Sequence, residues 1–410
     1  MGYFLQPAHV IRHHGRRLQE GVPVTQEVQP QETLTADERS RYLRHLLLGE
    51  IGEAGQLKLK RSSVLCIGAG GLGSPALLYL AAAGVGRIGI VDPDVVDSSN
   101  LQRQVLFDTS VVGQPKAVIA AARLRALNPY IEIETFAERF DETNADRMLS
   151  SFGAIMDGTD NFATRYLVND VAIKQGKPNF FGCIFRFSGQ LSVFAKETGC
   201  YRCLFPAPPA PELAPDCAQA GVLGVLPGLV GTYQALEFLK WQLGIGTSLA
   251  GKLLMIETMA NQFRTLKYAK NPECPACSDP SAIKLEGYQA ACASGPAGDV
   301  PITNISVAEL KARLAARDVV LIDVRNAVEH DIGNIGGTLL PVDVLAQQTR
   351  ETIRSVVPAD RDQPIAVYCR SGARSARACQ LLQQLGYTRV INVQGGIVAW
   401  QRDIDPNVRI

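Results

Sequence analysis

The feature that most restricts the fold is a glycine-rich turn between a short apolar run and an apolar helix. Ser63 to Ile67 is expected to form a strand, Gly68 to Gly73 (GAGGLG) the turn, and the Ala- and Leu-rich stretch that follows a helix. A second strand is expected from Arg87 to Val91. Strand, turn, helix and strand make a βαβ unit, which predicts an α/β domain with a mostly parallel sheet.

The same turn predicts a nucleotide site of the Rossmann-like kind. Glycines such as Gly71 let the backbone approach a phosphate, and the next helix offers unpaired N–H groups and the positive end of its dipole. Asp92 follows about twenty residues later, where a carboxylate can bond ribose hydroxyls. Taken alone, the turn also fits a dinucleotide site or a tight turn without a ligand.

Polar residues beyond Asp92 favour a triphosphate over a nicotinamide dinucleotide. Arg103 and Lys116 supply cations, and Asp160 supplies a carboxylate for magnesium, as a triphosphate requires. A nicotinamide dehydrogenase needs none of these groups. The predicted nucleotide-binding residues in this segment are Gly71, Asp92, Ser99, Asn100, Arg103, Gln104, Lys116, Asp160 and Asn161, with Arg103 and Asp160 also catalytic.

With 410 residues the chain is too long for one compact core, so two domains are expected. We predict a flexible N-terminal tail (1–30), a larger domain (31–277), a linker rich in small residues (278–300) and a smaller α/β domain (301–410). Capping-box spacing from Thr35 to Glu38 predicts a helix through Leu48. The other expected elements are helices 116–127 and 376–385 and strands 131–136, 154–156, 189–194, 253–257, 319–323, 365–368 and 390–392.

A reactive thiol is expected in the second domain. The strand Ile365 to Tyr368 ends in Cys369 and a helix follows, so backbone N–H groups and a helix dipole surround the sulfur. Arg370 and Arg374 add positive charge, which stabilises an anionic persulfide. Four residues separate Cys369 from Arg374, and a loop this short encloses a sulfur atom rather than a phosphate. An inactive module of this kind normally lacks the cysteine.

Four of the ten cysteines form two C-x-x-C pairs, Cys200/Cys203 and Cys274/Cys277. Two such pairs supply four thiolates for a closed, structural zinc site. Redox dithiols or unpaired thiols are the alternative, but Pro275 inside the second pair is typical of zinc ribbons. A chain with many cysteines and no recognisable secretory signal favours the reducing cytoplasm over a disulfide scaffold.

From Leu34 to Cys277 the chain resembles the MoeB and ThiF adenylyltransferase family, relatives of the ubiquitin-activating enzymes. The matching segments are Arg41 to Arg44, the glycine turn, Asp92, Ser99 to Gln104, Gln114 to Lys116, Asp157 to Asn161 and Cys217 to Gly228. The resemblance implies that Asp160 holds magnesium and that Lys116 and Arg103 hold phosphates. It also implies that Arg44 reaches the ATP of an opposite protomer, and therefore a homodimer, and it supports the zinc site.

The second domain resembles a rhodanese through Leu321 to Arg325, the Cys369 loop and Gln394 to Trp400. One departure is Asn334, where that family often has His. In the adenylyltransferase part, the family resemblance puts Cys217 on a crossover loop, where it can form a thioester or a mixed disulfide. No histidine stands near Cys217 in the sequence, and a non-essential loop thiol is the alternative.

Together these features predict an adenylyltransferase and sulfurtransferase that uses ATP, Mg²⁺ and Zn²⁺. Its expected partner is a ubiquitin-like sulfur carrier ending in Gly-Gly, whose C-terminal glycine is adenylylated and then converted to a thiocarboxylate by sulfur from Cys369. The expected sulfur donor is a cysteine desulfurase or thiosulfate. The pathway stays open among molybdopterin, thiamine, cysteine, tRNA thiolation and siderophore synthesis.

Three alternative functions remain at this stage: an NAD-dependent oxidoreductase, a standalone thiosulfate sulfurtransferase and a non-catalytic binding module. The net charge of +1 gives no sign of a nucleic-acid partner. The most apolar stretch is short and contains Pro227, so no membrane span is expected.

Overall fold

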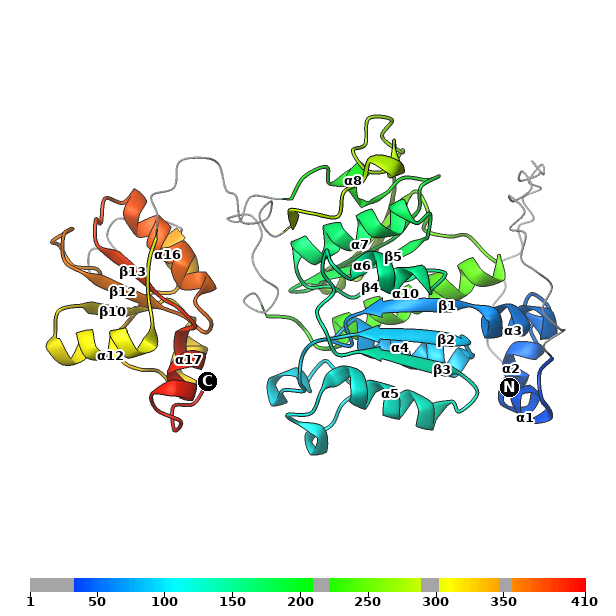
Figure 1. Ribbon diagram of the computed structural model, residues 1–410, viewed down its shortest axis with the longest axis horizontal. Coiled ribbons are helices and arrows are strands. Elements are labelled where there is room, and N and C mark those ends of the chain that lie inside the picture. Colours follow the sequence, from blue (N-terminus) through cyan, green and yellow to red (C-terminus); the bar gives the residue numbers. More distant parts are fainter. Residues whose placement is uncertain (1–32, 209–220, 289–301, 347–355) are drawn as a thin grey trace.

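The computed structural model describes residues 33–208, 221–288, 302–346 and 356–410, which form two α/β bodies, each on its own sheet (Figure 1). The prediction of a large, mostly parallel α/β domain followed by a smaller one is confirmed. The predicted flexible tail and Cys217 lie outside the described residues. No helix in the described part of the chain is long and apolar enough to cross a bilayer.

The first sheet has eight strands in the order β3-β2-β1-β4-β5-β6-β7-β8. Its parallel strands are β1 (Ser63–Ile67), β2 (Arg87–Val91), β3 (Glu132–Phe136), β4 (Ile155–Asp157) and β5 (Asn179–Phe185). The antiparallel extension consists of β6 (Ser188–Phe194), β7 (Lys252–Glu257) and β8 (Gln262–Lys267). The strand order reverses direction between β1 and β4, which is where ligands bind in open α/β sheets.

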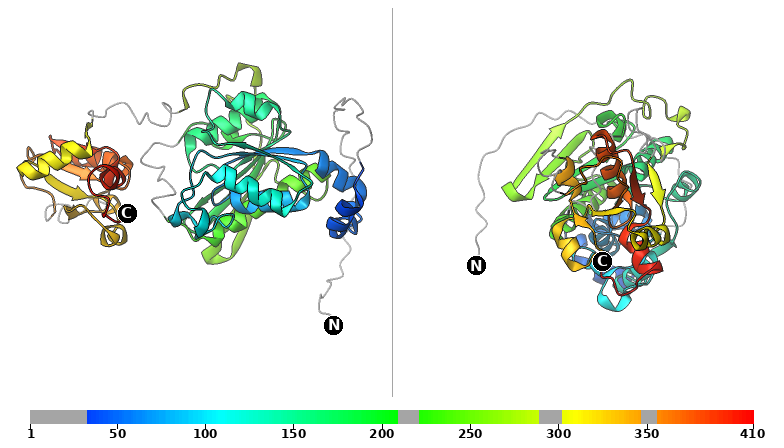
Figure 2. Two further views of the ribbon diagram at one scale, coloured as in Figure 1. Left: turned by 60° about the horizontal axis from the view of Figure 1, so that its bottom comes forward. Right: turned by 90° about the vertical axis from the view of Figure 1, so that its left-hand side faces the viewer.

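Helices cover both faces of this sheet (Figure 2). One face carries α4 (Gly73–Ala83), α5 (Lys116–Leu127) and α10 (Val225–Leu243), and the other carries α6 (Ala145–Ser150) and α7 (Phe162–Lys174). Each face has its own cluster of buried apolar side chains, as expected when a sheet is covered on both sides. Nearly every residue of α7 is buried, so this helix has no solvent face.

The turn from β1 to α4 is tight enough to require glycine. Gly68 has φ of +93°, and a Cβ on Gly73 would lie 2.0 Å from the Gly68 carbonyl oxygen. The backbone at the start of α4 therefore lies directly against the end of β1, as the glycine pattern predicts.

The N-terminal helix is shorter than predicted. Thr35 and Glu38 form the expected capping box at the start of α1 (Ala36–Arg41), but a helix continuing to Leu48 is wrong. The helix ends at Tyr42, whose buried hydroxyl accepts a hydrogen bond from the Asn128 side chain. Two further helices follow the break, α2 (Leu43–Leu46) and α3 (Gly52–Arg61). A contact distant in sequence therefore ends this helix.

The second sheet has five parallel strands in the order β11-β10-β12-β13-β9. They are β9 (Thr303–Ile305), β10 (Val320–Asp323), β11 (Thr338–Leu339), β12 (Ile365–Tyr368) and β13 (Val390–Val393). One face packs against α14 (Val342–Ala346) and α16 (Ala373–Gln384), and the other against α12 (Val307–Ala316) and α17 (Gly396–Asp403). The helix α13 (Ala327–Ile332) follows β10.

Part of the stretch predicted as a linker packs against the first domain. Ile283 contacts the cluster of C-x-x-C cysteines, and Leu285 and Tyr288 contact the core on the α6 and α7 face. The structure does not describe residues 289–301. The other domain boundaries stay predictions.

Candidate active sites

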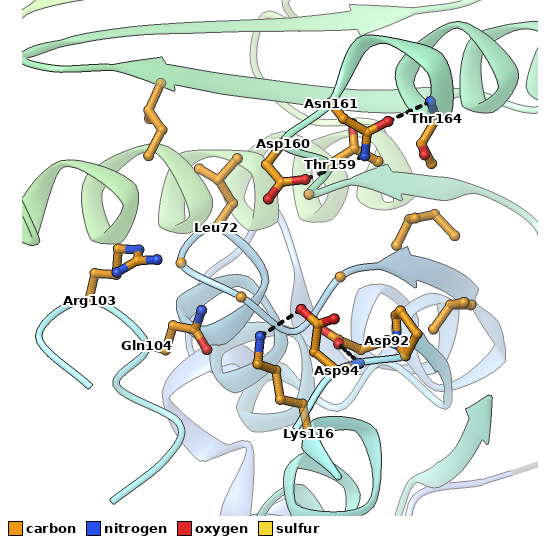
Figure 3. Close-up of a pocket in the computed structure, with 18 of the residues that line it drawn as sticks. Leu72, Asp92, Asp94, Arg103, Gln104, Lys116, Thr159, Asp160, Asn161 and Thr164 are labelled. Atoms are coloured by element: carbon orange, nitrogen blue, oxygen red, sulfur yellow. Dashed lines mark hydrogen bonds and ion pairs between the residues drawn. The ribbon is translucent and has the colours of Figure 1, made fainter. Parts of the chain in front are cut away.

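A cavity of about 450 Å³ opens at the carboxyl ends of β1, β2 and β4, at the reversal point of the first sheet. This volume is within the range of small-molecule sites. Figure 3 shows the polar side chains that face it. The lining includes Gly68, Gly70, Gly71, Asp92, Asp94, Arg103, Gln104, Lys116, Arg139, Phe140, Thr159, Asp160, Asn161, Arg165, Ile184, Gly221 and Val222.

Asp92, at the end of β2, is held against the glycine turn. Its two carboxylate oxygens accept hydrogen bonds from the backbone N–H of Ala69, at 2.8 Å, and of Asp94, at 2.9 Å. Burial raises the pKa of Asp92, and these N–H groups oppose the rise. A carboxylate has about four acceptor positions, so Asp92 can still accept hydrogen bonds from ribose hydroxyls.

Four cationic residues among those described line the cavity, Arg103, Lys116, Arg139 and Arg165. Lys116, at the start of α5, is almost fully buried and donates to Asp94 Oδ2 at 3.0 Å. Since the Asp94 carboxylate is two-thirds exposed, water screens its interaction with Lys116. Arg103 donates to the Ser99 carbonyl oxygen at 3.1 Å and lies beside Gln104 (Figure 3).

Asp160 is exposed on the opposite wall, just before α7. Asn161 caps α7, because its side-chain oxygen accepts from the Thr164 N–H at 2.9 Å. The side-chain amide of Asn161 lies 3.4 Å from Asp160. Behind them, the fully buried Asp157 accepts from the Thr159 hydroxyl at 2.6 Å, and burial raises the pKa of Asp157. The buried Asp157 therefore holds the turn that presents the exposed Asp160 carboxylate, whose oxygens can still bind a metal ion.

Two buried polar atoms on the lining have no hydrogen-bond partner among the described residues, Gln104 Oε1 and Arg165 Nε. Buried polar groups are nearly always paired, so unpaired ones that line a cavity point to a polar ligand there. The cations, the carboxylate and these two atoms together fit a nucleoside triphosphate with its magnesium ion.

Arg165 also lines the cavity, but the sequence pattern did not predict it as a site residue. Its guanidinium is buried on α7 over the rings of Phe162 and Phe181, and it donates to the Thr159 carbonyl oxygen at 3.1 Å. Within a helix, an arginine usually indicates a solvent face. The only available signal was that the residues on both sides of Arg165 are mostly apolar.

Three predicted nucleotide-binding residues do not line the cavity of this protomer. Ser99 and Asn100 form the short helix η1 (Ser98–Asn100), which Asp97 caps and which leads to Arg103. Arg44 is exposed on α2, near the amino ends of the strands (Figure 1). Its placement at the ATP of another protomer stays a prediction.

The two C-x-x-C pairs converge. Cys200 Sγ lies 3.5 Å from Cys274 Sγ and 4.0 Å from Cys203 Sγ, while Cys203 Sγ and Cys277 Sγ are 3.4 Å apart. All four sulfurs lie within 4.8 Å of one another. Four sulfurs bound to one zinc ion at about 2.3 Å would be about 3.8 Å apart, so the donor set fits zinc.

The electrostatics of the cluster also suit a cation. Burial and the neighbouring thiols raise the pKa of Cys277 to about 12 and raise that of Cys200 further. Burial opposes ionisation of Cys274 too, but the N–H groups of Cys277 and Ala276 outweigh it and lower its pKa. Four thiolates at this spacing repel one another unless a cation neutralises them.

In the second domain, Cys369 lies at the end of β12 with a side chain only 1% exposed. Its Sγ accepts from the Gly372 N–H at 3.1 Å, and the Ser375 hydroxyl lies 3.4 Å away. The loop is also held from outside. The N–H groups of Ile397 and Val398, in the first turn of α17, donate to the carbonyl oxygens of Cys369 and Arg370 at 2.9 and 3.1 Å.

Gly396 makes this close approach possible. A Cβ at this position would lie 2.3 Å from the Cys369 carbonyl oxygen and 2.7 Å from that of Arg370. Two helices therefore converge on the cysteine loop with their amino ends. Helix α16 begins beside the sulfur, and α17 fixes the loop carbonyls.

The cations of the loop are not equivalent. Arg374 is buried in a bidentate ion pair with Glu329, with both N–O distances 2.6 Å, whereas Arg370 is exposed. Burial disfavours the charged guanidinium, but Glu329 outweighs it and raises the pKa of Arg374. Glu329 thus offsets much of the Arg374 charge, and among the described residues the sulfur accepts from the Gly372 N–H group and the Ser375 hydroxyl.

A second buried cluster supports the loop from β10. Asp323 accepts from Arg325 at 2.6 Å, from the Tyr368 hydroxyl at 2.8 Å, and lies 2.9 Å from His330 Nδ1. Burial opposes ionisation of Asp323, but these partners outweigh it and lower its pKa. Asn334, the departure from the rhodanese pattern, donates to the His330 carbonyl oxygen at 3.1 Å.

Cys217 itself is not described, but the residues that follow it are. Gly221 and Val222 line the nucleotide cavity, and Val222 pairs with Arg186 in the turn between β5 and β6. The described chain therefore resumes at the cavity, four residues after Cys217.

This chain combines a triphosphate-sized polar cavity at a glycine turn with a cysteine held in a sulfur-sized loop. These two sites define an enzyme that joins nucleotide chemistry to sulfur transfer. The profile of the ThiF family matches residues 42–276, and that of the rhodanese-like domain matches residues 306–403. The chain belongs to the ThiF family and carries a C-terminal rhodanese-like domain, and it is an adenylyltransferase and sulfurtransferase.

Three relatives support this assignment. "Probable adenylyltransferase/sulfurtransferase MoeZ" of Mycobacterium tuberculosis is 40% identical, covering 93% of this chain and 97% of the relative. "Adenylyltransferase and sulfurtransferase MOCS3" of Mus musculus is 38% identical, covering 92% and 88%. "Sulfur carrier protein adenylyltransferase" of Thermus thermophilus is 50% identical, covering 63% of this chain and 98% of the relative.

Among solved structures, the Escherichia coli protein MccB with ATP aligns with a TM-score of 0.52. The two chains are 21% identical, and the alignment covers 60% of this chain and 76% of MccB. This likeness shows a shared fold for the first domain.

Proposed function

We propose that the chain adenylylates the C-terminal glycine of a ubiquitin-like sulfur carrier and then converts it to a thiocarboxylate with sulfur carried on Cys369. The observation that carries the proposal is the presence in one chain of both sites, a cavity lined by cations and an exposed carboxylate, and a buried cysteine whose sulfur accepts from the Gly372 N–H group and the Ser375 hydroxyl. The activities named for the relatives support both steps.

In the first step, the carrier carboxylate attacks the α-phosphorus of ATP, forming the acyl-adenylate and releasing pyrophosphate. Arg103 and Lys116 face the region where negative charge builds up and stabilise it electrostatically. Asp92 orients the ribose, and the backbone of the glycine turn approaches the phosphates. Arg165 and Gln104 have unpaired polar atoms on the lining with which to position the acyl phosphate.

In the second step, the terminal sulfur of a Cys369 persulfide attacks the acyl carbon and expels AMP. The product is an acyl disulfide between the carrier and Cys369. Attack by a second thiol on Cys369 Sγ then releases the carrier thiocarboxylate and leaves a disulfide, which an external thiol reduces. Cys217 is the candidate for the second thiol, or it holds the acyl group as a thioester beforehand.

Two metal ions belong to this proposal. A magnesium ion on Asp160 would neutralise phosphate charge, and a zinc ion on the four C-x-x-C cysteines would fix the end of the first domain. Metal analysis of the purified protein should find one zinc per chain, and the Cys203→Ser and Cys277→Ser variants should lose it. A protein that is stable and metal-free would contradict the zinc assignment.

The proposed partners are the carrier, a cysteine desulfurase or thiosulfate as sulfur donor, and a second copy of the chain that supplies Arg44. A reducing cytoplasm suits free thiols, and the eight described cysteines are all free.

The decisive experiment is ATP–pyrophosphate exchange with a panel of ubiquitin-like proteins ending in Gly-Gly. Exchange with at least one of them, followed by thiocarboxylate detected by mass spectrometry when a sulfur donor is added, would support the proposal. A chain that exchanges with none, or that binds NAD in place of ATP, would overturn it. Thiosulfate sulfurtransferase activity alone would leave only the standalone alternative.

A further inference from the structure

Tyr288 is buried in the first domain although the neighbouring sequence is typical of a linker. Its side chain is 6% exposed and lies among the apolar residues of the α6 and α7 face. Its hydroxyl donates to Asp170 Oδ2 at 2.7 Å, and its backbone N–H donates to Glu142 Oε1 at 2.8 Å. Both the side chain and the backbone of Tyr288 are therefore held by the first domain.

The hydrogen-bond partners of Tyr288 connect it to the nucleotide cavity and to the cluster of C-x-x-C cysteines. Glu142 belongs to the loop after β3, and Arg139 and Phe140 of the same loop line the nucleotide cavity. Phe140 also shares the buried cluster with Tyr288. The last described residue of the first domain is thus fixed beside the rim of the cavity.

Asp170 links the anchor to the cysteine cluster. Arg202, between the ligands Cys200 and Cys203, donates to Asp170 at 2.7 and 2.8 Å, and its guanidinium lies over the Tyr166 ring. The Asp170 carboxylate is buried and accepts from both Arg202 and Tyr288. The end of the domain, the cysteine cluster and the cavity rim are joined by one polar network.

We infer that Tyr288 is a positioning residue, which fixes the start of the tether to the second domain at the rim of the nucleotide cavity and so raises the effective concentration of Cys369 there. This inference rests on the proposed function. It assigns Tyr288 no contact with the substrate and no part in either chemical step.

The chain length sets the size of the effect. Thirteen residues, 289–301, separate Tyr288 from the second domain, and they reach at most about 45 Å. Without the Tyr288 anchor the contacts of Ile283 and Leu285 remain, so the tether begins after Leu285 and contains sixteen residues. Effective concentration falls with about the −3/2 power of tether length once the tether exceeds the span, which gives a decrease of about 1.4-fold. Moving the start of the tether away from the cavity rim reduces the effective concentration of Cys369 further.

The test separates sulfur delivery from each chemical step. Tyr288→Phe removes only the hydroxyl, and Tyr288→Ala removes the whole anchor. For Tyr288→Ala we expect single-turnover thiocarboxylate formation from Cys369 persulfide to fall at least about 1.4-fold. Pyrophosphate exchange, thiosulfate-to-cyanide sulfur transfer, and thiocarboxylate formation from free sulfide should keep their wild-type rates.

A local readout does not depend on activity. Lys284 is exposed and lies between the contacts of Ile283 and Leu285, so trypsin should cleave after Lys284 faster in Tyr288→Ala than in the wild type. The matched control is Tyr387→Phe, which removes a hydroxyl that donates to the Pro358 carbonyl oxygen in the second domain. This control should change neither cleavage nor sulfur delivery.

A second variant keeps the anchor and lengthens the tether. A Gly/Ser insertion between residues 289 and 301, as long as residues 278–288, should lower sulfur delivery about 2.5-fold without changing cleavage at Lys284. Unchanged delivery in both the insertion and Tyr288→Ala would overturn the inference, as would an equal loss of pyrophosphate exchange in Tyr288→Ala. Failure of the proposed function is distinct, because the wild type itself would then show no exchange.

Discussion

The nucleotide site and the sulfur site are both built on a strand–turn–helix junction, but they differ in what the junction can enclose. In both, a parallel strand ends at a glycine-containing turn and a helix begins beside the ligand. At the nucleotide site the turn opens into a cavity of about 450 Å³, and side chains from several elements supply the charge. At the sulfur site the amino end of α17 holds the loop carbonyls, Glu329 offsets Arg374, and the Gly372 N–H group donates to the sulfur. What packs outside the turn therefore decides whether a strand–helix junction binds a large anion or a single sulfur.

The largest effect should separate the two sites completely. Cys369→Ala removes the sulfur-carrying atom, so thiosulfate-to-cyanide transfer should fall more than about 10³-fold. Pyrophosphate exchange should be unchanged, because Cys369 takes no part in adenylylation. The two assays on one preparation check this, and a parallel loss of exchange would show that the sites are not independent.

The reciprocal change is Asp160→Ala. Loss of the carboxylate proposed to hold magnesium should lower pyrophosphate exchange by about 10²–10³-fold, while sulfur transfer to cyanide stays at the wild-type rate. Glu197→Ala is the control, since it removes an exposed carboxylate that does not line the cavity. Unchanged exchange in Asp160→Ala would refute its assignment to magnesium.

A matched pair of glycine variants tests the role of packing at each turn. Gly73→Ala puts a Cβ against the Gly68 carbonyl oxygen, and Gly396→Ala puts one against that of Cys369. We expect each to lower the activity of its own site about tenfold or more through displacement of the turn, with little effect on the other. Gly228→Ala, where a Cβ meets nothing within 4 Å, should leave both rates unchanged.

The smallest effect concerns the ion pair that offsets Arg374. Burial opposes ionisation of Glu329, but Arg374 outweighs it and lowers the pKa of Glu329. Glu329→Gln should lower the free energy of unfolding by about 1–2 kcal/mol at pH 7. A carboxyl whose folded pKa is depressed contributes stability above its unfolded pKa of about 4.3, and loses it as pH falls through the folded value.

The difference between wild type and Glu329→Gln should therefore shrink as the pH falls below about 4. Thermal melts of the two proteins between pH 7 and pH 3 measure it. A difference that is constant over this range would mean that the ion pair contributes no net stability.

The sequence predicted the local features of the fold and not the distant contacts. The bounds of β1, β2, α5 and β12 were predicted correctly, because apolar runs and flanking turns set them locally. The helix break at Tyr42 depends on Asn128, and the burial of Tyr288 depends on Asp170, contacts that no local pattern reveals. The strand β5 was missed although Gly176 to Pro178 mark a turn directly before it.

The same distinction holds for the candidate sites. Asp92, Lys116 and Asp160 follow strand ends or begin a helix of the first domain, so their convergence follows from its parallel sheet. Cys369 follows a strand end of the second sheet. Arg165 does not, because its role depends on a helix being buried on all sides. The pairing of Arg374 with Glu329 was likewise invisible, since forty-five positions separate the two residues.

The burial of Cys369 affects how easily its thiol is oxidised or alkylated. A cysteine that is 1% exposed is poorly accessible to peroxides and alkylating agents, which attack accessible thiolates. The same packing restricts the donor that loads Cys369 and the second thiol that attacks its Sγ. Protection from oxidation and access for these partners are therefore opposing demands on one loop.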